Sequence, residues 1–313
     1  MNSFHSLSAG GPSGERPAHI REAVASDRGN TLLPTLTRLV NHMAAGKTPS
    51  AVTPYLCGGN LFAALKKSGG HRPIAVWETL RRLTAKCVTR KATADAKESL
   101  APNQLGVGVK GGAEAIIHAV NAVFHDNNIA DKDKWILQVD FSNAFNGISR
   151  EEMQNRIREH CPKAAAWTES CYSSASHLFF SQTKICSSTG SQQGDPEAEL
   201  LFSLVLLPLI KRIKEECPNL LLLLFYLEDG TLLVDVLICK KPSTLSKTRD
   251  LVWVSRSILA SLSSGAGPHP PWNSTGTTPW TGMSHVHLWR VSPCLGHRLE
   301  TFPSAVTSSM KGF

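Results

Sequence analysis

The sequence predicts an α+β fold, in which antiparallel strands are backed by helices. Three short apolar runs are bounded by turn-forming residues, as strands are, and they cover residues 135–139, 220–226 and 231–238. Apolar residues recur at helical spacing in two other segments, 32–43 and 113–125. Hairpin strands together with amphipathic helices favour the α+β class.

Turn and cap residues set the bounds of the other elements in the first half of the chain. Residues 1–30 are rich in Gly, Ser, Pro and charge, so we expect them to be disordered. A strand is expected at 71–76 after the turn Ser68-Gly69-Gly70, and a basic helix at 78–92. Ser149-Arg150-Glu151-Glu152 is a capping box that begins a further helix.

The second half contains further helices and a different tail. We expect a helix at 164–173, a hairpin at 177–188 and a buried helix at 200–216 that is kinked at Pro208. Beyond residue 238, Pro, Ser, Thr, Gly and Trp dominate and periodicity is lost, so 239–313 is expected to be a low-complexity, disordered tail.

Charge favours a polyanionic partner. The chain has a formal charge of +8, and residues 60–97 hold nine Lys or Arg against two acids, a net +7. A solvated helix face is the alternative explanation of this segment. Residues 102–112 are glycine-rich, but no strand precedes them and the spacing does not favour a dinucleotide-binding turn.

The sequence carries no signal for secretion or membrane insertion. The longest apolar runs, 200–210 and 220–227, fall short of the roughly 18 residues that a spanning helix needs. The eight cysteines show neither a C-x-x-C pair nor zinc-ligand spacing. We therefore expect an intracellular protein with reduced thiols and no membrane partner; nuclear and cytoplasmic locations both stay open.

Three carboxylates occur where strands end or turn. Asp140 ends the run at 135–139, and Glu228 and Asp229 lie at the turn between the last two strands. If the hairpin pairs with the first strand, these carboxylates converge and supply the oxygen ligands that magnesium favours. Phosphoryl transfer uses two such metals about 3.5–4 Å apart. The alternative is that Asp140 forms a turn and Asp229-Gly230 makes the hairpin.

Four stretches together resemble the reverse transcriptase family, in particular the enzymes of non-long-terminal-repeat retroelements. They are K-K-S-G-G-H-R-P-I-A-V (66–76), V-D-F-S-N-A-F (139–145), Q-Q-G-D-P (192–196) and Y-L-E-D (226–229). The resemblance covers about residues 32–238. It implies a polymerase palm, an antiparallel sheet backed by helices, together with a fingers subdomain.

The resemblance also implies a division of the chain and an activity. Residues 31–112 would form a fingers-like basic region, and residues 113–238 the palm-like core. The implied activity is RNA-templated DNA synthesis on an RNA template and a DNA primer, with deoxynucleoside triphosphates as substrates. The oligomeric state does not follow from it.

Site residues follow from the matching motifs. By resemblance, the catalytic residues that hold Mg²⁺ or Mn²⁺ are Asp140, Glu228 and Asp229. Lys66 or Lys67 and Arg72 would contact the triphosphate, which suits their charge. The other residues expected near the nucleotide are Phe141 beside the metal, Phe145 beneath the sugar where it excludes a 2′-hydroxyl, and Gln193 and Gly194 along the nucleotide and template.

Departures from the family pattern predict impaired activity. Glu228 stands where the family has Asp, and its extra methylene moves the carboxylate by about 1 Å, a displacement that can cost on the order of 100-fold in rate. Trp77 replaces a Gly, and Glu197-Ala198-Glu199 replaces Leu-Gly-Pro. After residue 238 we find neither the later palm motif nor a thumb, so we expect a truncated element. The alternative function is a non-catalytic, nucleic-acid-binding remnant of a retroelement that uses residues 60–97.

Overall fold

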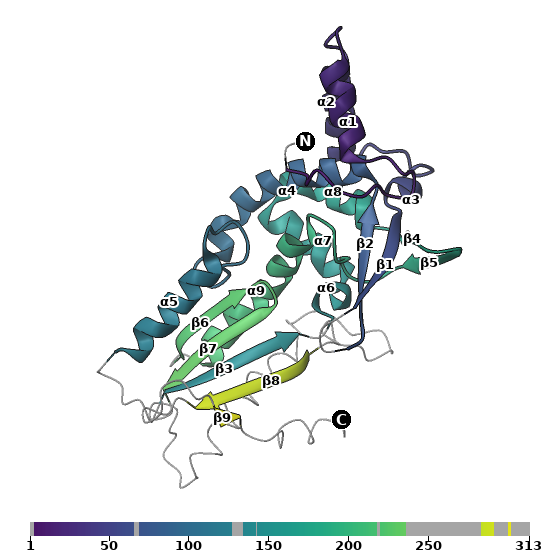
Figure 1. Ribbon diagram of the computed structural model, residues 1–313. Helices are drawn as coiled ribbons and strands as arrows, with labels where there is room; N and C mark the ends of the chain where they lie inside the picture. Colours follow the sequence, from purple (N-terminus) through teal and green to yellow (C-terminus); the bar gives the residue numbers. More distant parts are fainter. Residues whose placement is uncertain are drawn as a thin grey trace. The chain divides into compact units, whose positions relative to one another are not determined.

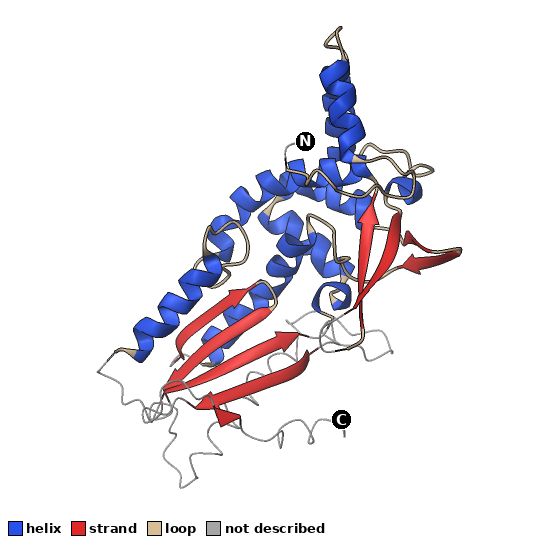
Figure 2. Ribbon diagram, in the orientation of Figure 1, coloured by secondary structure: helices blue, strands red, loops and turns tan. Residues whose placement is uncertain are grey.

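The computed structural model describes most of the chain up to residue 235 and two short strands beyond it (Figure 1). The described residues are 3–65, 69–126, 134–141, 143–217, 220–235, 283–290 and 300–301. They belong to two compact units, each built from two chain segments: Met1–Ala96 with Phe145–Val205, and Lys97–Ala144 with Leu206–Phe313. Helices and strands are mixed in both (Figure 2), so the predicted α+β class is confirmed.

The first unit combines helices with a four-stranded sheet. Its sheet has the order β2-β1-β4-β5, in which β1 pairs antiparallel with β2 and parallel with β4. The strands are β1 (Gly59–Leu65), β2 (His71–Trp77), β4 (Ser176–Phe180) and β5 (Thr183–Ser187). The helices are α1 (Pro17–Ser26), α2 (Leu32–Ala44), α3 (Thr53–Leu56), α6 (Ala144–Gly147), α7 (Arg150–His160) and α8 (Pro162–Tyr172).

Along the sequence, two of the boundaries between the units fall within long helices. These helices are α4 (Thr79–Leu100) and α9 (Ala198–Glu216). Helix α4 is longer than the expected 78–92, while α9 begins two residues before its expected start and includes Pro208. The predicted capping box begins α7, where the Ser149 hydroxyl accepts a hydrogen bond from the Glu152 amide.

The second unit is a five-stranded antiparallel sheet with a helix beside its edge strand. The sheet order is β6-β7-β3-β8-β9, and α5 (Gly112–Phe124) lies beside β6. The strands are β3 (Lys134–Phe141), β6 (Leu220–Tyr226), β7 (Asp229–Asp235), β8 (Met283–Arg290) and β9 (Glu300–Thr301). Leu137, Val139 and Leu232 are buried side chains of the central strands. The predicted hairpin of residues 220–238 is therefore present as β6 and β7.

The N-terminal segment differs from the disorder expected for residues 1–30. Phe4 is 7% exposed and packs against Val40 and Leu83. The Ser13 amide and hydroxyl donate hydrogen bonds of 2.7 and 2.6 Å to the two carboxylate oxygens of Glu78. Composition indicated disorder, but one buried aromatic ring and a few specific hydrogen bonds hold this segment against the rest of the unit.

The tail contains more structure than its composition indicated. Strand β8 pairs antiparallel with β3 along its length, and β9 pairs with β8. The rest of the predicted tail 239–313 lies outside the described residues, as do Lys66, Lys67 and Ser68. Within the described part of the chain, no helix is both long enough and apolar enough to cross a membrane.

A first prediction concerns the N-terminal segment. Phe4→Ala should lower the free energy of unfolding by about 2–3 kcal/mol, because it removes a buried ring and leaves a cavity beside Val40 and Leu83. Leu7→Ala is the matched control, since Leu7 is 75% exposed, and it should change stability by no more than about 0.5 kcal/mol. Urea unfolding measures both. Equal, small effects would show that this segment does not contribute to the core.

Candidate functional site

Asp140 and Asp229 lie on paired strands of the second unit. Strands β3 and β7 are antiparallel, and their register runs to Val139 opposite Gly230. Asp140 follows Val139 and Asp229 precedes Gly230, so the two acidic residues occupy the next opposing positions. Both are exposed. Partial burial and the negative charge of Asp140 raise the pKa of the Asp229 carboxyl above its ordinary value.

Glu228 belongs to the turn rather than to either strand. Tyr226 pairs with Asp229 and closes a two-residue turn of Leu227 and Glu228. Leu227 has a φ of 55°, in the left-handed region. The described residues contain no group of three or more His, Cys, Asp or Glu that could hold a metal ion. The sheet register brings Asp140 and Asp229 together, and the convergence of all three carboxylates stays a prediction.

The carboxylate pair suits a divalent cation. Burial is the larger cause of the raised pKa of Asp229 and the negative charge of Asp140 is the second. A bound cation would relieve the repulsion between these like charges. Magnesium is commonly held by only one or two carboxylates together with substrate phosphates. Asp140 and Asp229 would supply two such carboxylates. Phe141, predicted to lie beside the metal, is the last residue of β3 and is buried.

In the first unit, Gln193 and Gly194 lie against strand β2. The Ala75 amide donates a 3.0 Å hydrogen bond to the Gln193 carbonyl. Gly194 has a φ of 104°, and a Cβ on it would lie 2.5 Å from the Ala75 carbonyl oxygen. Only glycine allows the backbone to come this close. The predicted nucleotide-binding loop is therefore joined to the strand that carries Arg72, whose side chain is exposed.

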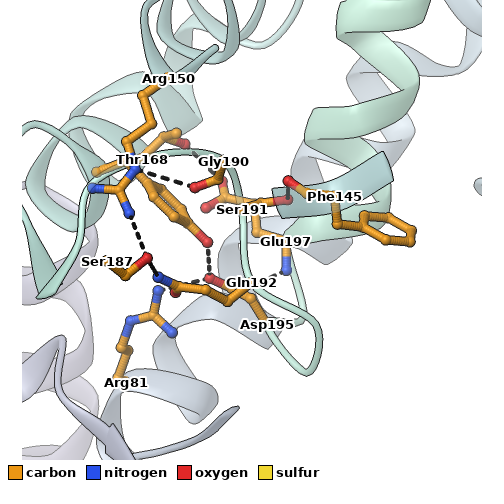
Figure 3. Close-up of polar contacts among 11 residues, drawn as sticks. Arg81, Phe145, Arg150, Thr168, Ser187, Gly190, Ser191, Gln192, Asp195 and Glu197 are labelled. Carbon is orange, nitrogen blue, oxygen red and sulfur yellow. Dashed lines mark hydrogen bonds and ion pairs between the residues drawn. The ribbon is translucent and has the colours of Figure 1, made fainter. Parts of the chain in front are cut away.

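Phe145 packs into the interior of the first unit. It lies in α6, is 9% exposed, and its ring centroid is 5.3 Å from that of Phe202. Its carbonyl accepts hydrogen bonds from the Ser191 amide, at 2.9 Å, and the Ser191 hydroxyl, at 3.2 Å. Figure 3 shows the ring pointing away from the polar groups of the loop. The structure thus connects Phe145 to the loop through its backbone.

A buried ion pair holds the other side of the loop (Figure 3). The side chains of Arg81 and Asp195 are each almost completely inaccessible, and Arg81 Nη2 lies 2.6 Å from Asp195 Oδ2. The Tyr172 hydroxyl donates a hydrogen bond to the same oxygen. The Arg81 guanidinium also lies 4.0 Å from the ring centroid of Trp77. The sequence placed Arg81 in the basic segment and Asp195 in the Q-Q-G-D-P motif, and it gave no sign that they meet. Trp77, which departs from the family pattern, is the sequence feature that could have indicated a buried cation at Arg81.

Glu197 is a second buried acid of this cluster. The Thr168 hydroxyl donates a 2.7 Å hydrogen bond to its carboxylate, and its own amide donates to Asp195 at 3.0 Å. Burial, and then the charge of Asp195, raise the pKa of the Glu197 carboxyl to about 8. This acid is therefore largely protonated at neutral pH. Arg150 closes the cluster by donating to the Gly190 carbonyl at 3.1 Å.

Comparison with known proteins supplies the family. A family model described as reverse transcriptase (RNA-dependent DNA polymerase) matches residues 64–249, more than half of the chain. The chain belongs to the reverse transcriptase family. The resemblance predicted from the sequence motifs is confirmed, and all four motifs lie within the matched residues.

The other comparisons add little to the reverse transcriptase assignment. Curated proteins give no match. Among solved structures, apo telomerase from Candida tropicalis, truncated from its C-terminal domain, matches at 11% identity and a TM-score of 0.44. The match covers 64% of this chain and 46% of the telomerase chain, so this reverse transcriptase chain spans under half the length of that protein.

The basic segment of this reverse transcriptase offers fewer free charges than its sequence indicated. Arg81 is buried in the ion pair, while Arg82 and Lys86 contact Phe4 and backbone carbonyls of the N-terminal segment. Lys66 and Lys67 lie outside the described residues. The exposed cations of the segment are Arg72, Arg90, Lys91 and Lys97.

The second prediction concerns pH. The raised pKa of Glu197 means that its stabilising contribution is complete below about 4.5, the ordinary value, and is lost as pH rises through about 8. Glu197→Gln should remove this loss, so the variant should match the wild type near pH 5 and exceed its stability near pH 9 by roughly a few kcal/mol. Urea unfolding across this range measures the effect. Glu199→Gln, at an exposed position of α9, is the control, and parallel pH profiles for Glu197→Gln and wild type would contradict the prediction.

The third prediction concerns the carboxylate pair. Asp140→Asn should lower the pKa of Asp229, because it removes one of the two causes of the shift and leaves burial as the other. NMR titration of the Asp229 carboxyl carbon measures this pKa. Glu98→Gln, at an exposed position of α4, should leave it unchanged. A pKa that does not respond to Asp140→Asn would show that the two carboxyls do not interact.

Proposed function

We propose that this chain carries a nucleotidyl-transfer site at Asp140 and Asp229 and is built for RNA-templated DNA synthesis. Members of its family act on a template and primer with deoxynucleoside triphosphates. The observation that carries the proposal is the pairing of β3 with β7, which sets these two carboxylates side by side. After burial, the charge of Asp140 is the second cause of the raised pKa of Asp229, and a bound cation would relieve this repulsion.

The proposed metal ligands are Asp140 and Asp229, with Glu228 as the third acid implied by the family motif. When bound, Mg²⁺ or Mn²⁺ would neutralise developing negative charge on the transferred phosphate. The protein's own part is to hold the two carboxylates in register. Because the pKa of Asp229 is raised, protons compete for this site at a higher pH than at an ordinary aspartate.

By the family motifs, Arg72, Gln193 and Gly194 would contact the nucleotide. Gln193 and Gly194 lie against β2, and the exposed guanidinium of Arg72 has the charge and the paired donors that suit a phosphate. Lys66 and Lys67 complete the predicted triphosphate contacts. The sugar-discriminating role of Phe145 stays a prediction; its packing against Phe202 would make the ring rigid in that role.

We further propose that activity is impaired. Glu228 stands at the turn where the family motif has Asp, and its side chain is one methylene longer. A displaced third carboxylate weakens a site for a metal that demands near-ideal geometry. The chain would then be a weakened enzyme derived from a retroelement.

A non-catalytic nucleic-acid-binding remnant is the second candidate. It is favoured by the exposed cations Arg72, Arg90 and Lys91, which do not depend on the carboxylate pair. Binding through such charges weakens steeply as salt concentration rises. Changing these three residues together to Gln should flatten that salt dependence.

The fourth prediction separates the two candidates. In a primer-extension assay on an RNA template, the full chain should show weak, divalent-metal-dependent synthesis that Asp140→Ala abolishes. Glu228→Asp should increase it, by less than the roughly 100-fold that a 1 Å misplacement can cost. Glu215→Asp, on the exposed face of α9, is the matched control.

Two outcomes would contradict the catalytic proposal. Synthesis that persists in Asp140→Ala would place the site elsewhere. Absence of synthesis in both the wild type and Glu228→Asp, with salt-sensitive binding of an RNA–DNA hybrid, would favour the binding candidate.

A further inference from the structure

Gln104 contacts the turn that precedes Asp229. Its side chain is 1% exposed, although it is polar and lies in a loop between α4 and α5. The Leu227 amide donates a 2.9 Å hydrogen bond to the Gln104 Oε1 atom, and the Gln104 Nε2 atom donates a 3.1 Å hydrogen bond to the Leu227 carbonyl. One amide side chain thus satisfies both backbone groups of a single turn residue.

The backbone around Gln104 is fixed to the neighbouring strand. The Phe225 amide donates to the Asn103 carbonyl at 2.7 Å, and the Leu105 amide donates to the Phe225 carbonyl at 2.8 Å. The Asn103 side chain donates to the Leu223 carbonyl at 2.7 Å. The loop therefore runs along β6 as an added strand would, and it presents the Gln104 side chain to the turn from a rigid base.

Gly106 packs so closely against Leu227 that no side chain fits between them. A Cβ on Gly106 would lie 2.5 Å from the Leu227 amide nitrogen and 2.7 Å from its side chain. The Gly106 amide also donates to Gln104 Oε1 at 2.9 Å, so this oxygen accepts two hydrogen bonds. The orientation of the Gln104 amide is thereby set, with its NH₂ group directed to the Leu227 carbonyl.

Leu227 adopts a conformation that its side chain does not favour. Its φ of 55° lies in the left-handed region, where a bulky residue is an outlier. Such a conformation persists when the surroundings impose it. The two hydrogen bonds between Leu227 and the Gln104 side chain are contacts that can hold this conformation. Strand β7 begins two residues later, at Asp229.

We propose that Gln104 is a positioning residue for the carboxylate site: it holds Leu227 in the left-handed conformation and so fixes the start of β7 at Asp229. The inference rests on the proposed function, since it concerns the same metal site. Gln104 itself touches neither Asp140 nor Asp229 among the hydrogen bonds of the described residues, so its effect on a metal would pass through the turn.

The fifth prediction uses glycine to test this mechanism. Gln104→Met keeps the length of the side chain, removes its hydrogen bonds to Leu227 and should weaken Mn²⁺ binding by the full chain about tenfold, as loss of a buried hydrogen-bond pair does. Leu227→Gly accepts a positive φ without strain and needs no clamp. The double variant should therefore bind Mn²⁺ within about threefold of Leu227→Gly alone. Electron paramagnetic resonance of free Mn²⁺ measures the affinity.

A residue that only fills the core would give another result. The effects of Gln104→Met and Leu227→Gly would then add, and the double variant would bind about tenfold more weakly than Leu227→Gly; that result would overturn the proposal. If Gln104→Met does not fold, Gln104→Asn replaces it in the cycle. Asn keeps an amide in the buried site but is one methylene too short to make both hydrogen bonds.

Separate measurements distinguish failure of this inference from failure of the proposed function. Mn²⁺ binding by the wild type that Asp140→Ala does not weaken would overturn the proposed metal site, and with it the positioning role of Gln104 there. Hydrogen exchange of the Leu227 amide reports the clamp independently of metal. It should become about tenfold faster in Gln104→Met, and unchanged exchange would show that Gln104 does not hold the turn.

Discussion

The antiparallel pairing of β3 with β7 is the constraint on which the candidate site depends. Because opposing residues of paired strands lie within a few ångströms of each other, the register that places Val139 opposite Gly230 also fixes the distance between Asp140 and Asp229. A shift of one residue would turn one carboxylate to the other face of the sheet. The buried side chains of β3 and β7 oppose such a shift, so core packing and site geometry have the same cause.

Buried polar side chains contact the backbone or side chains of two predicted motif segments, the loop of Gln193 and Gly194 and the turn before Asp229. Arg81 and Asp195 anchor the loop of Gln193 and Gly194, and Gln104 anchors the turn before Asp229. Burying such groups costs free energy, and their ion pair and hydrogen bonds offset part of that cost only in this arrangement of the loops. Two departures from the family pattern gain a structural explanation here. Trp77 covers the Arg81 guanidinium, and Glu197 donates its amide to Asp195 while its carboxyl stays largely protonated.

The charge of the sequence is a poor guide to the charge that a ligand meets. Arg81 belongs to the net +7 segment, yet it neutralises a buried aspartate. Arg82 and Lys86 bind carbonyl oxygens of an N-terminal segment that composition indicated to be disordered. These contacts leave Arg72, Arg90, Lys91 and Lys97 exposed. Among the described residues, a nucleic acid bound to this segment would therefore meet fewer positive side chains than the sequence indicated.

The sequence alone determined the local features: the α+β class, the hairpin of β6 and β7, the cap of α7, and Asp140 at a strand end. Periodicity, turn residues and caps are short-range signals, so they can be predicted without a fold. Only the tertiary structure decided that Asp140 and Asp229 lie on paired strands, and that Phe4, Arg81 and Gln104 are buried. Arg81 and Asp195 are 114 residues apart and Gln104 and Leu227 are 123 apart, and no local pattern encodes contacts at that separation.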